Sequence, residues 1–119
     1  EEDASEYFDI NCASPFMLFS PRVKEITKKV APAIVHIDGS ARLQTVSKKI
    51  YPLLHKVLCL WKAQSGIPIL LNTSFNGKDE PIVENPENAI DTFLKSPLNT
   101  MFLGNYIVTR KVLIDSDQI

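Results

Sequence analysis

The sequence has almost no net charge, little cysteine and no long apolar run. Its 119 residues carry 13 basic and 14 acidic side chains, for a formal net charge of -1. The chain therefore lacks the basic character that proteins use to bind nucleic acid. No apolar run approaches the roughly 20 residues of a membrane span, and the acidic first residues do not resemble a signal peptide. These absences argue against both nucleic acid and membrane as partners.

Cysteine and histidine are too sparse to predict a metal site. Cys12 and Cys59 stand in apolar contexts without CxxC spacing, which indicates reduced core thiols and a cytoplasmic location. His36 lies between aliphatic residues with no second ligand at metal spacing, and His55 is expected to be solvated. The length suits a single domain, residues 1–119. Because the sequence opens on Glu1 without Met, we expect a piece of a longer polypeptide.

The apolar pattern predicts an α+β fold, with two helices packed on one side of a mixed β-sheet. A long helix is expected from Pro52 to Gly66, packing Leu54, Val57, Leu58 and Trp61 on the sheet, and a second from Asn85 and Pro86 through Leu94. Strands are expected at residues 16–19, 33–37, 41–46, 68–72, 101–103 and 106–110, with 68–72 the most buried. Residues 1–8 are expected to form a short helix or arm, 22–29 a charged connection, and 38–40 a turn.

A polar turn directly after an apolar run is the most informative stretch. Asn72, Thr73, Ser74 and Asn76 follow residues 67–71 and bring several hydrogen-bond donors into one short segment. Such a cluster suits an anionic ligand such as phosphate. Two asparagines and a glycine also make an ordinary turn, and from composition alone that is the commoner interpretation.

A second polar stretch follows the expected strand at 33–37. Alternation on a strand would direct Arg42 and Gln44 to the same face, where a guanidinium can hold a phosphate or carboxylate through two parallel hydrogen bonds. A surface ion pair is the alternative role for Arg42. A hydrolase triad can be drawn from Ser74, His36 and Asp38, but Ser74 lacks the Gly-x-Ser-x-Gly elbow that exposes a nucleophile.

The order and wording of several motifs carry a family resemblance. They are SPFM at 14–17, HIDGSARLQTV at 36–46, SGIPILLNTSFNGKDEPIV at 65–83, ENPENAIDTF at 84–93 and MFLGNYIVTRK at 101–111. Together they resemble the C-terminal part of the O-carbamoyltransferases of the nodulation-protein and antibiotic-tailoring family. The resemblance covers nearly the whole chain.

The resemblance implies a YrdC-like nucleotide-binding domain that joins carbamoyl phosphate with ATP and Mg²⁺, releases pyrophosphate and leaves carbamoyl adenylate. A separate actin-like, metal-binding N-terminal domain would then pass the carbamoyl group to an acceptor hydroxyl. Arg42 matches the family's phosphate-clamping arginine, the one catalytic residue implied here. Asn72 and Ser74 match its phosphate-binding Asn and Ser, with Ser40 and Asn76 as weaker matches.

One departure from the family pattern concerns its cationic contacts. A motif like K-x-R-E followed by R-P-F-A-P is expected immediately before Glu1 and does not occur in this sequence. We therefore expect an incomplete site that is inactive by itself and binds ATP weakly. The alternative is a non-catalytic module that kept the fold and binds a small ligand or a protein. An uncovered apolar surface that pairs copies is also expected.

Overall fold

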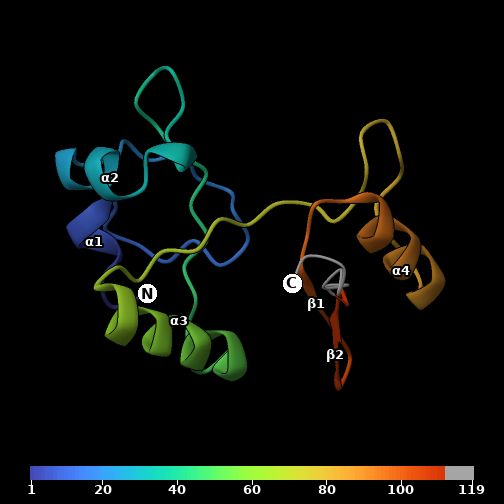
Figure 1. The fold of residues 1–119 in the computed structure, drawn as a ribbon. Coiled ribbons are helices and arrows are strands. Elements are labelled where there is room, and N and C mark those ends of the chain that lie inside the picture. The colour runs from blue at the N-terminus through green and yellow to red at the C-terminus, as the bar shows by residue number, and fades with distance from the viewer. Residues whose placement is uncertain (112–119) are drawn as a thin grey trace, which may run out of the picture. The chain divides into compact units, whose positions relative to one another are not determined.

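The computed structural model describes residues 1–111, in which helices and one small sheet alternate with long irregular segments (Figure 1). The chain divides into two compact units, Glu1–Asn72 and Thr73–Ile119. These are the first and the second unit. No helix in the described residues is long and apolar enough to cross a membrane.

The first unit is built from short helices joined by irregular chain. Its elements are α1 (Ala4–Tyr7), α2 (Glu25–Val30), the 3-10 helix η1 (Pro32–Ile34) and α3 (Pro52–Ser65). Three isolated antiparallel bridges pair Phe8 with Val23, Phe19 with Leu43, and Arg22 with Ser40. None of them extends into a strand in this unit, because each pairs a single residue with a single partner.

A small apolar core holds these segments together. Tyr7, Phe8, Val23, Ala41 and Leu43 are buried against one another. Side chains complete the backbone pairing that a sheet would otherwise supply: Ser14 Oγ donates to the Leu43 carbonyl at 2.9 Å, and the Ser14 amide donates to Thr45 Oγ1 at 2.8 Å. The unit is therefore closed by side-chain bonds together with scattered backbone bonds between distant segments.

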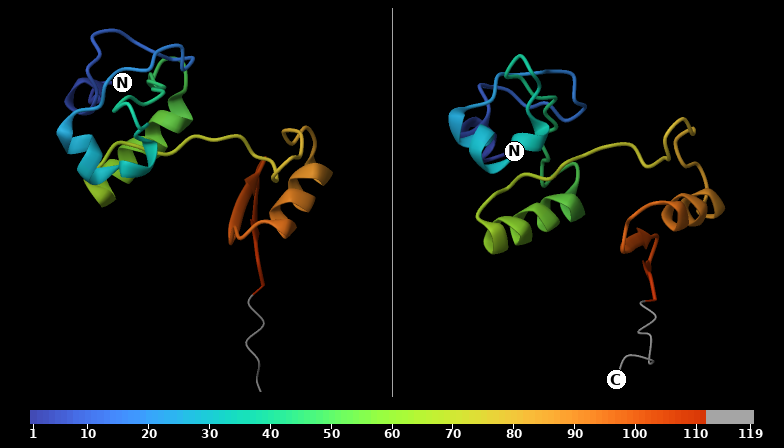
Figure 2. Two further views of the ribbon diagram at one scale, coloured as in Figure 1. Left: turned by 90° about the horizontal axis from the view of Figure 1, so that it is seen from above. Right: turned by 45° about the horizontal axis from the view of Figure 1, so that its top comes forward.

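Helix α3 has the predicted ends but not the predicted packing. It begins at Pro52 and ends at Ser65, where Gly66 adopts a left-handed conformation with φ of 79°. None of its residues is buried, and the expected core face remains partly exposed, as at Trp61. Figure 2 shows α3 as a separate rod beside the shorter helices of the first unit. The prediction that this helix packs on a sheet is wrong, since the described part of this unit has no sheet.

The second unit is a helix on a hairpin. Helix α4 (Pro86–Lys95) is capped by Asn85, whose side chain accepts from the Asn88 amide. Strands β1 (Thr100–Leu103) and β2 (Tyr106–Thr109) pair antiparallel around Gly104, with Thr100 opposite Thr109 and Leu103 opposite Tyr106. Ala89 and Phe93 of α4 are buried against Met101 of β1. The second helix and both C-terminal strands form within one residue of the predicted bounds. Ile90, which the apolar pattern predicts on the core face with Ala89 and Phe93, is exposed.

The α+β class is confirmed, but the sheet is smaller than expected: within residues 1–111 it has two antiparallel strands and is not mixed. The strands expected at 16–19, 33–37, 41–46 and 68–72 are absent, and residues 22–29 contain most of α2. Pro32 starts η1 in place of a strand. The stretch expected to be the most buried strand is exposed at Leu70 and Leu71, and the carbonyl of Ile69 accepts from the Trp61 indole. The single-domain organisation of residues 1–119 stays a prediction.

Candidate functional site

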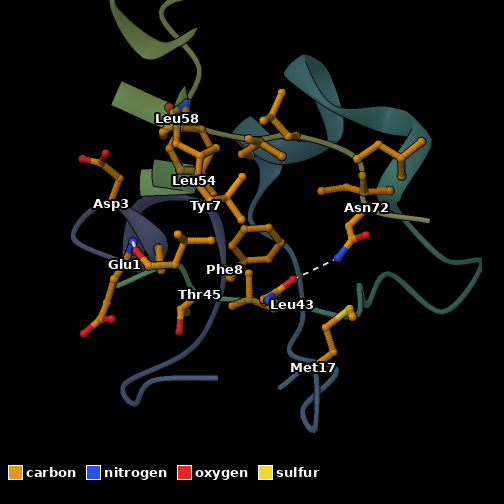
Figure 3. Close-up of a pocket in the computed structure, with 18 of the residues that line it drawn as sticks. Glu1, Asp3, Tyr7, Phe8, Met17, Leu43, Thr45, Leu54, Leu58 and Asn72 are labelled. Carbon is orange, nitrogen blue, oxygen red and sulfur yellow. Dashed lines mark hydrogen bonds between the residues drawn. The ribbon is translucent and has the colours of Figure 1, made fainter. Parts of the chain in front are cut away.

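The first unit contains a cavity of about 560 Å³, a size typical of small-molecule sites. Its apolar wall includes Tyr7 and Phe8 from the region of α1, Leu43, and Leu54 and Leu58 from α3. Figure 3 shows these side chains around the cavity, with Asn72 at its edge. The cavity therefore lies between the core of the unit and the exposed helix α3.

Asn72 and Gln44 form a polar section of this wall. The Asn72 Nδ2 atom donates to Gln44 Oε1 at 2.9 Å, the dashed line in Figure 3. Gln44 Nε2 in turn donates to the Pro15 carbonyl at 3.2 Å. Both ends of the Gln44 amide are thus engaged. Asn72 keeps its carbonyl oxygen and a second N–H for a ligand.

Arg42 lines the same cavity and is exposed. Ala41, Leu43 and Thr45 are buried, so alternation places Arg42 and Gln44 on the opposite side of this segment, as predicted. Its guanidinium has no hydrogen bond or ion pair with another residue in the range 1–111. Five N–H donors therefore remain for a ligand, and the alternative of a surface ion pair has no partner within the described chain.

Ser40 lies in a turn that precedes Arg42. Its hydroxyl donates to Asp38 Oδ1 at 2.7 Å, its amide donates to the same oxygen at 2.9 Å, and His36 Nδ1 lies 3.1 Å from the hydroxyl. The Ser40 hydroxyl and then its amide lower the pKa of Asp38. Ser40 is buried and is not among the residues lining the cavity. In this structure it holds the turn that leads to Arg42.

Ser74 and Asn76 belong to the second unit and close their own loop. Ser74 Oγ donates to Asn76 Oδ1 at 2.6 Å, and Asn76 Nδ2 donates to the carbonyls of Gly77 and Glu80 at 3.2 and 3.0 Å. These bonds have the geometry of a side-chain-stabilised turn. The Ser74 hydroxyl donates to an amide and not to a histidine, which gives the hydrolase interpretation no support.

A further group on the cavity wall was missed from the sequence. His55 and Cys59 lie one turn apart on α3, with Cys59 Sγ 3.6 Å from His55 Nδ1, and Glu2 contacts the other ring nitrogen at 3.2 Å. The i,i+4 spacing could have indicated the first contact, but nothing local indicated Glu2. Cys12 and Cys59 are both exposed, so the prediction that they are core thiols is wrong.

The chain was compared with protein families and with curated proteins. The family model described as Carbamoyltransferase C-terminus matches residues 1–110. Nodulation protein NolO of Bradyrhizobium diazoefficiens is 46% identical over 114 residues, covering 93% of this chain and 21% of that protein. Nodulation protein NolNO of Sinorhizobium fredii is 39% identical over 120 residues, which cover 98% of this chain and 18% of that protein. This chain thus spans about a fifth of the length of these relatives.

Proposed function

This chain belongs to the carbamoyltransferase C-terminus family, and from that membership we propose that its first unit holds part of carbamoyl phosphate and ATP while carbamoyl adenylate forms. One observation supports this most strongly. Arg42, Gln44 and Asn72 line a single cavity of about 560 Å³, and Arg42 and Asn72 retain donors for a ligand. Lys62, the other basic side chain lining the cavity, is paired with Asp3. The combination of the Arg42 guanidinium, positioned amides and a cavity of suitable size fits a small phosphate compound.

Each polar residue has a distinct role in this proposal. The Arg42 guanidinium donates two parallel hydrogen bonds to phosphate oxygens. Asn72 donates a further bond, and Gln44 fixes the Asn72 side chain by the 2.9 Å contact. Adenylyl transfer depends mainly on positioning and on neutralising charge around phosphorus, which such donors provide. The assignments of Ser74, Asn76 and Ser40 as phosphate contacts rest on the family resemblance alone.

In this proposal, Mg²⁺ is bound by the phosphates of ATP. Within the described residues, no group of three or more His, Cys, Asp or Glu side chains has the arrangement to hold a metal ion. The residues of this chain are therefore proposed to contact phosphate and not a metal of their own. Transfer of the carbamoyl group to an acceptor hydroxyl, with the metal ion it uses, is assigned to a separate N-terminal domain of the enzyme.

Nuclear magnetic resonance titration of the isotope-labelled 119-residue chain tests the binding site. Carbamoyl phosphate and Mg-ATP should each bind weakly and shift the signals of Arg42, Gln44 and Asn72. Arg42→Ala should remove these shifts, whereas Lys48→Ala should leave them unchanged, because Lys48 is exposed and does not line the cavity. Equal affinity in the Arg42→Ala variant would contradict the proposed site. If neither carbamoyl phosphate nor Mg-ATP shifted any signal, the result would favour the alternative of a non-catalytic interaction module.

The catalytic role needs a complete carbamoyltransferase that carries this sequence as its C-terminal part. There, Arg42→Ala should slow pyrophosphate release by about 100- to 1000-fold, equivalent to about 2.7 to 4 kcal/mol, as for loss of a positioned donor. Ser74→Ala should have a milder effect. Unchanged pyrophosphate release in both variants would refute the assignments. The 119-residue chain alone should not carbamoylate an acceptor, and micromolar ATP binding by it would contradict the expected incomplete site.

A further inference from the structure

Glu2, His55 and Cys59 form a connected group on the wall of the cavity. Cys59 Sγ lies 3.6 Å from His55 Nδ1, and His55 Nε2 lies 3.2 Å from both carboxylate oxygens of Glu2. Cys59 is exposed, whereas the imidazole keeps only 15% of its side-chain surface exposed. A thiol, a base and a group that orients the base therefore stand in the order that cysteine nucleophiles require.

The contacts fix which imidazole nitrogen is free to accept a proton. A backbone hydrogen bond and the contact with His55 lower the pKa of Glu2 to about 2, so its carboxylate is ionised at neutral pH and can only accept hydrogen bonds. Nε2 of His55 must therefore carry the hydrogen in this contact. In the neutral ring, Nδ1 is then unprotonated and faces the Cys59 thiol.

We propose that Cys59 is a reactive thiol, with His55 as the base that takes its proton and Glu2 as the residue that orients the imidazole. Its co-reactants are small soft electrophiles, namely alkylating carbon compounds and low-molecular-weight disulfides. The thiol proton passes to His55 Nδ1, and the sulfur then attacks. With a carbon electrophile, an S–C bond forms and the leaving group departs with its electron pair. With a disulfide, a mixed disulfide forms and one thiolate is released.

The surroundings are compatible with this chemistry and separate from the phosphate contacts. The other charged side chains lining the cavity are Glu1, Asp3, Arg42 and Lys62, and Asp3 is already paired with Lys62 at 2.7 Å. None of the three contacts within the group involves Arg42 or Asn72. The contacts proposed to activate Cys59 are therefore made by other residues than those proposed to hold phosphate, although both sets line one cavity.

Cys12 provides an internal reference on the same molecule. It is also a free, exposed cysteine, and it forms no hydrogen bond with another residue of the described range. Alkylation by iodoacetamide at pH 7, followed by mass spectrometry of the two cysteine-containing peptides, measures both rates in one sample. Cys59 should react roughly tenfold faster than Cys12, because His55 stands beside its thiol to take the proton as the sulfur attacks, whereas Cys12 has no such contact within the described residues.

Two variants separate the role of the base from the shape of the helix. His55→Gln should bring the Cys59 rate down to about that of Cys12, while Lys56→Gln, at an exposed neighbouring position, should not. Glu2→Gln should give an intermediate rate with a changed pH profile. Circular dichroism checks that α3 persists. Equal rates for the two cysteines in the unaltered chain would overturn the proposal, as would an unchanged Cys59 rate in a folded His55→Gln variant.

Discussion

Arg110, the residue directly after β2, forms hydrogen bonds with the C-terminal end of α4 and the loop that follows this helix. Its Nη2 atom donates to the carbonyls of Phe93, Leu94 and Ser96 at 2.7, 2.8 and 2.6 Å, and its Nε atom donates to the Leu98 carbonyl at 2.9 Å. The last carbonyls of a helix have no partner within the helix. Replacing Arg110 by methionine should therefore release the C-terminal end of α4.

The size of the effect follows from the number of hydrogens available. Nη2 has two hydrogens for three acceptors, so with Nε the guanidinium supplies about three full bonds, each worth about 1 kcal/mol at a partly exposed site. The guanidinium also lies 5.3 Å from the centre of the Phe93 ring. We expect Arg110→Met to lower the free energy of unfolding of the second unit by about 2 to 3 kcal/mol. Arg110→Lys should cost about half as much, since lysine keeps the charge and some of the bonds.

Amide hydrogen exchange localises this change to the second unit. A loss of about 2 to 3 kcal/mol should speed exchange of the most protected α4 amides by about 30- to 150-fold. Lys95→Met is the matched control at the same helix end, because its ion pair with Glu80 spans 3.5 Å between exposed side chains and should contribute under about 0.5 kcal/mol. Exchange in the Arg110→Met variant no faster than in this control would refute the reasoning.

Three further substitutions test the first unit, whose unfolding the single tryptophan reports. Ser14→Ala removes the hydroxyl that donates to the buried Leu43 carbonyl. It should lower the free energy of unfolding, measured by urea denaturation, by about 1 to 3 kcal/mol, and a change under about 0.5 kcal/mol would contradict this. Gly66→Ala should lower the free energy of unfolding by about 1 to 2 kcal/mol. The cost comes from the left-handed backbone, with φ of 79°, and not from a clash, because the added Cβ would meet no atom within 4 Å. An unchanged unfolding midpoint would disprove this conformation at the helix end. The folded-state pKa of Asp38 is lowered, so its stabilising effect is present above its ordinary pKa of 3.8 and is lost as pH falls through the lower folded value. Asp38→Asn should remove this part of the loss of stability in acid. If the free energy of unfolding depended on pH identically in the variant and the unaltered chain, Asp38 would make no such contribution.

The elements that could be predicted from the sequence are those with local signals at their ends. Pro52 and Gly66 bound α3, Asn85 and Pro86 start α4, and Gly104 turns the hairpin. Each signal acts through neighbouring residues, so no knowledge of the tertiary structure was needed.

The missing strands show where local reasoning fails. Residues 41–45 do alternate between buried and more exposed positions. The backbone groups of Leu43 and Thr45, however, pair with Ser14 and Phe19, 24 to 31 residues earlier, and do not form a ladder. The carbonyl of Ile69 is taken by the Trp61 side chain. Alternating apolar residues show that a segment is half-buried, but they do not show what its backbone pairs with.

The candidate site was predictable in part. Arg42 and Asn72 were identified by their motifs, and both line the same cavity. The role of Gln44 in holding Asn72 depends on a contact across 28 residues, and that of Glu2 at His55 on one across 53. Such contacts leave no periodic trace in the sequence, so they had to be seen in the structure.

The long-range bonds that close the first unit also bear on the order in which the chain folds. Ser14 reaches Leu43 and Thr45 over 29 and 31 residues, and Asn72 reaches Gln44 over 28. Each bond requires a large loop to close, and the entropy lost in closing it comes before any compensating burial of apolar side chains, which slows folding. The second unit needs only a short hairpin and an adjacent helix. We therefore expect the second unit to form first when the whole chain refolds from denaturant, with the cavity and its polar wall assembled in the slower step.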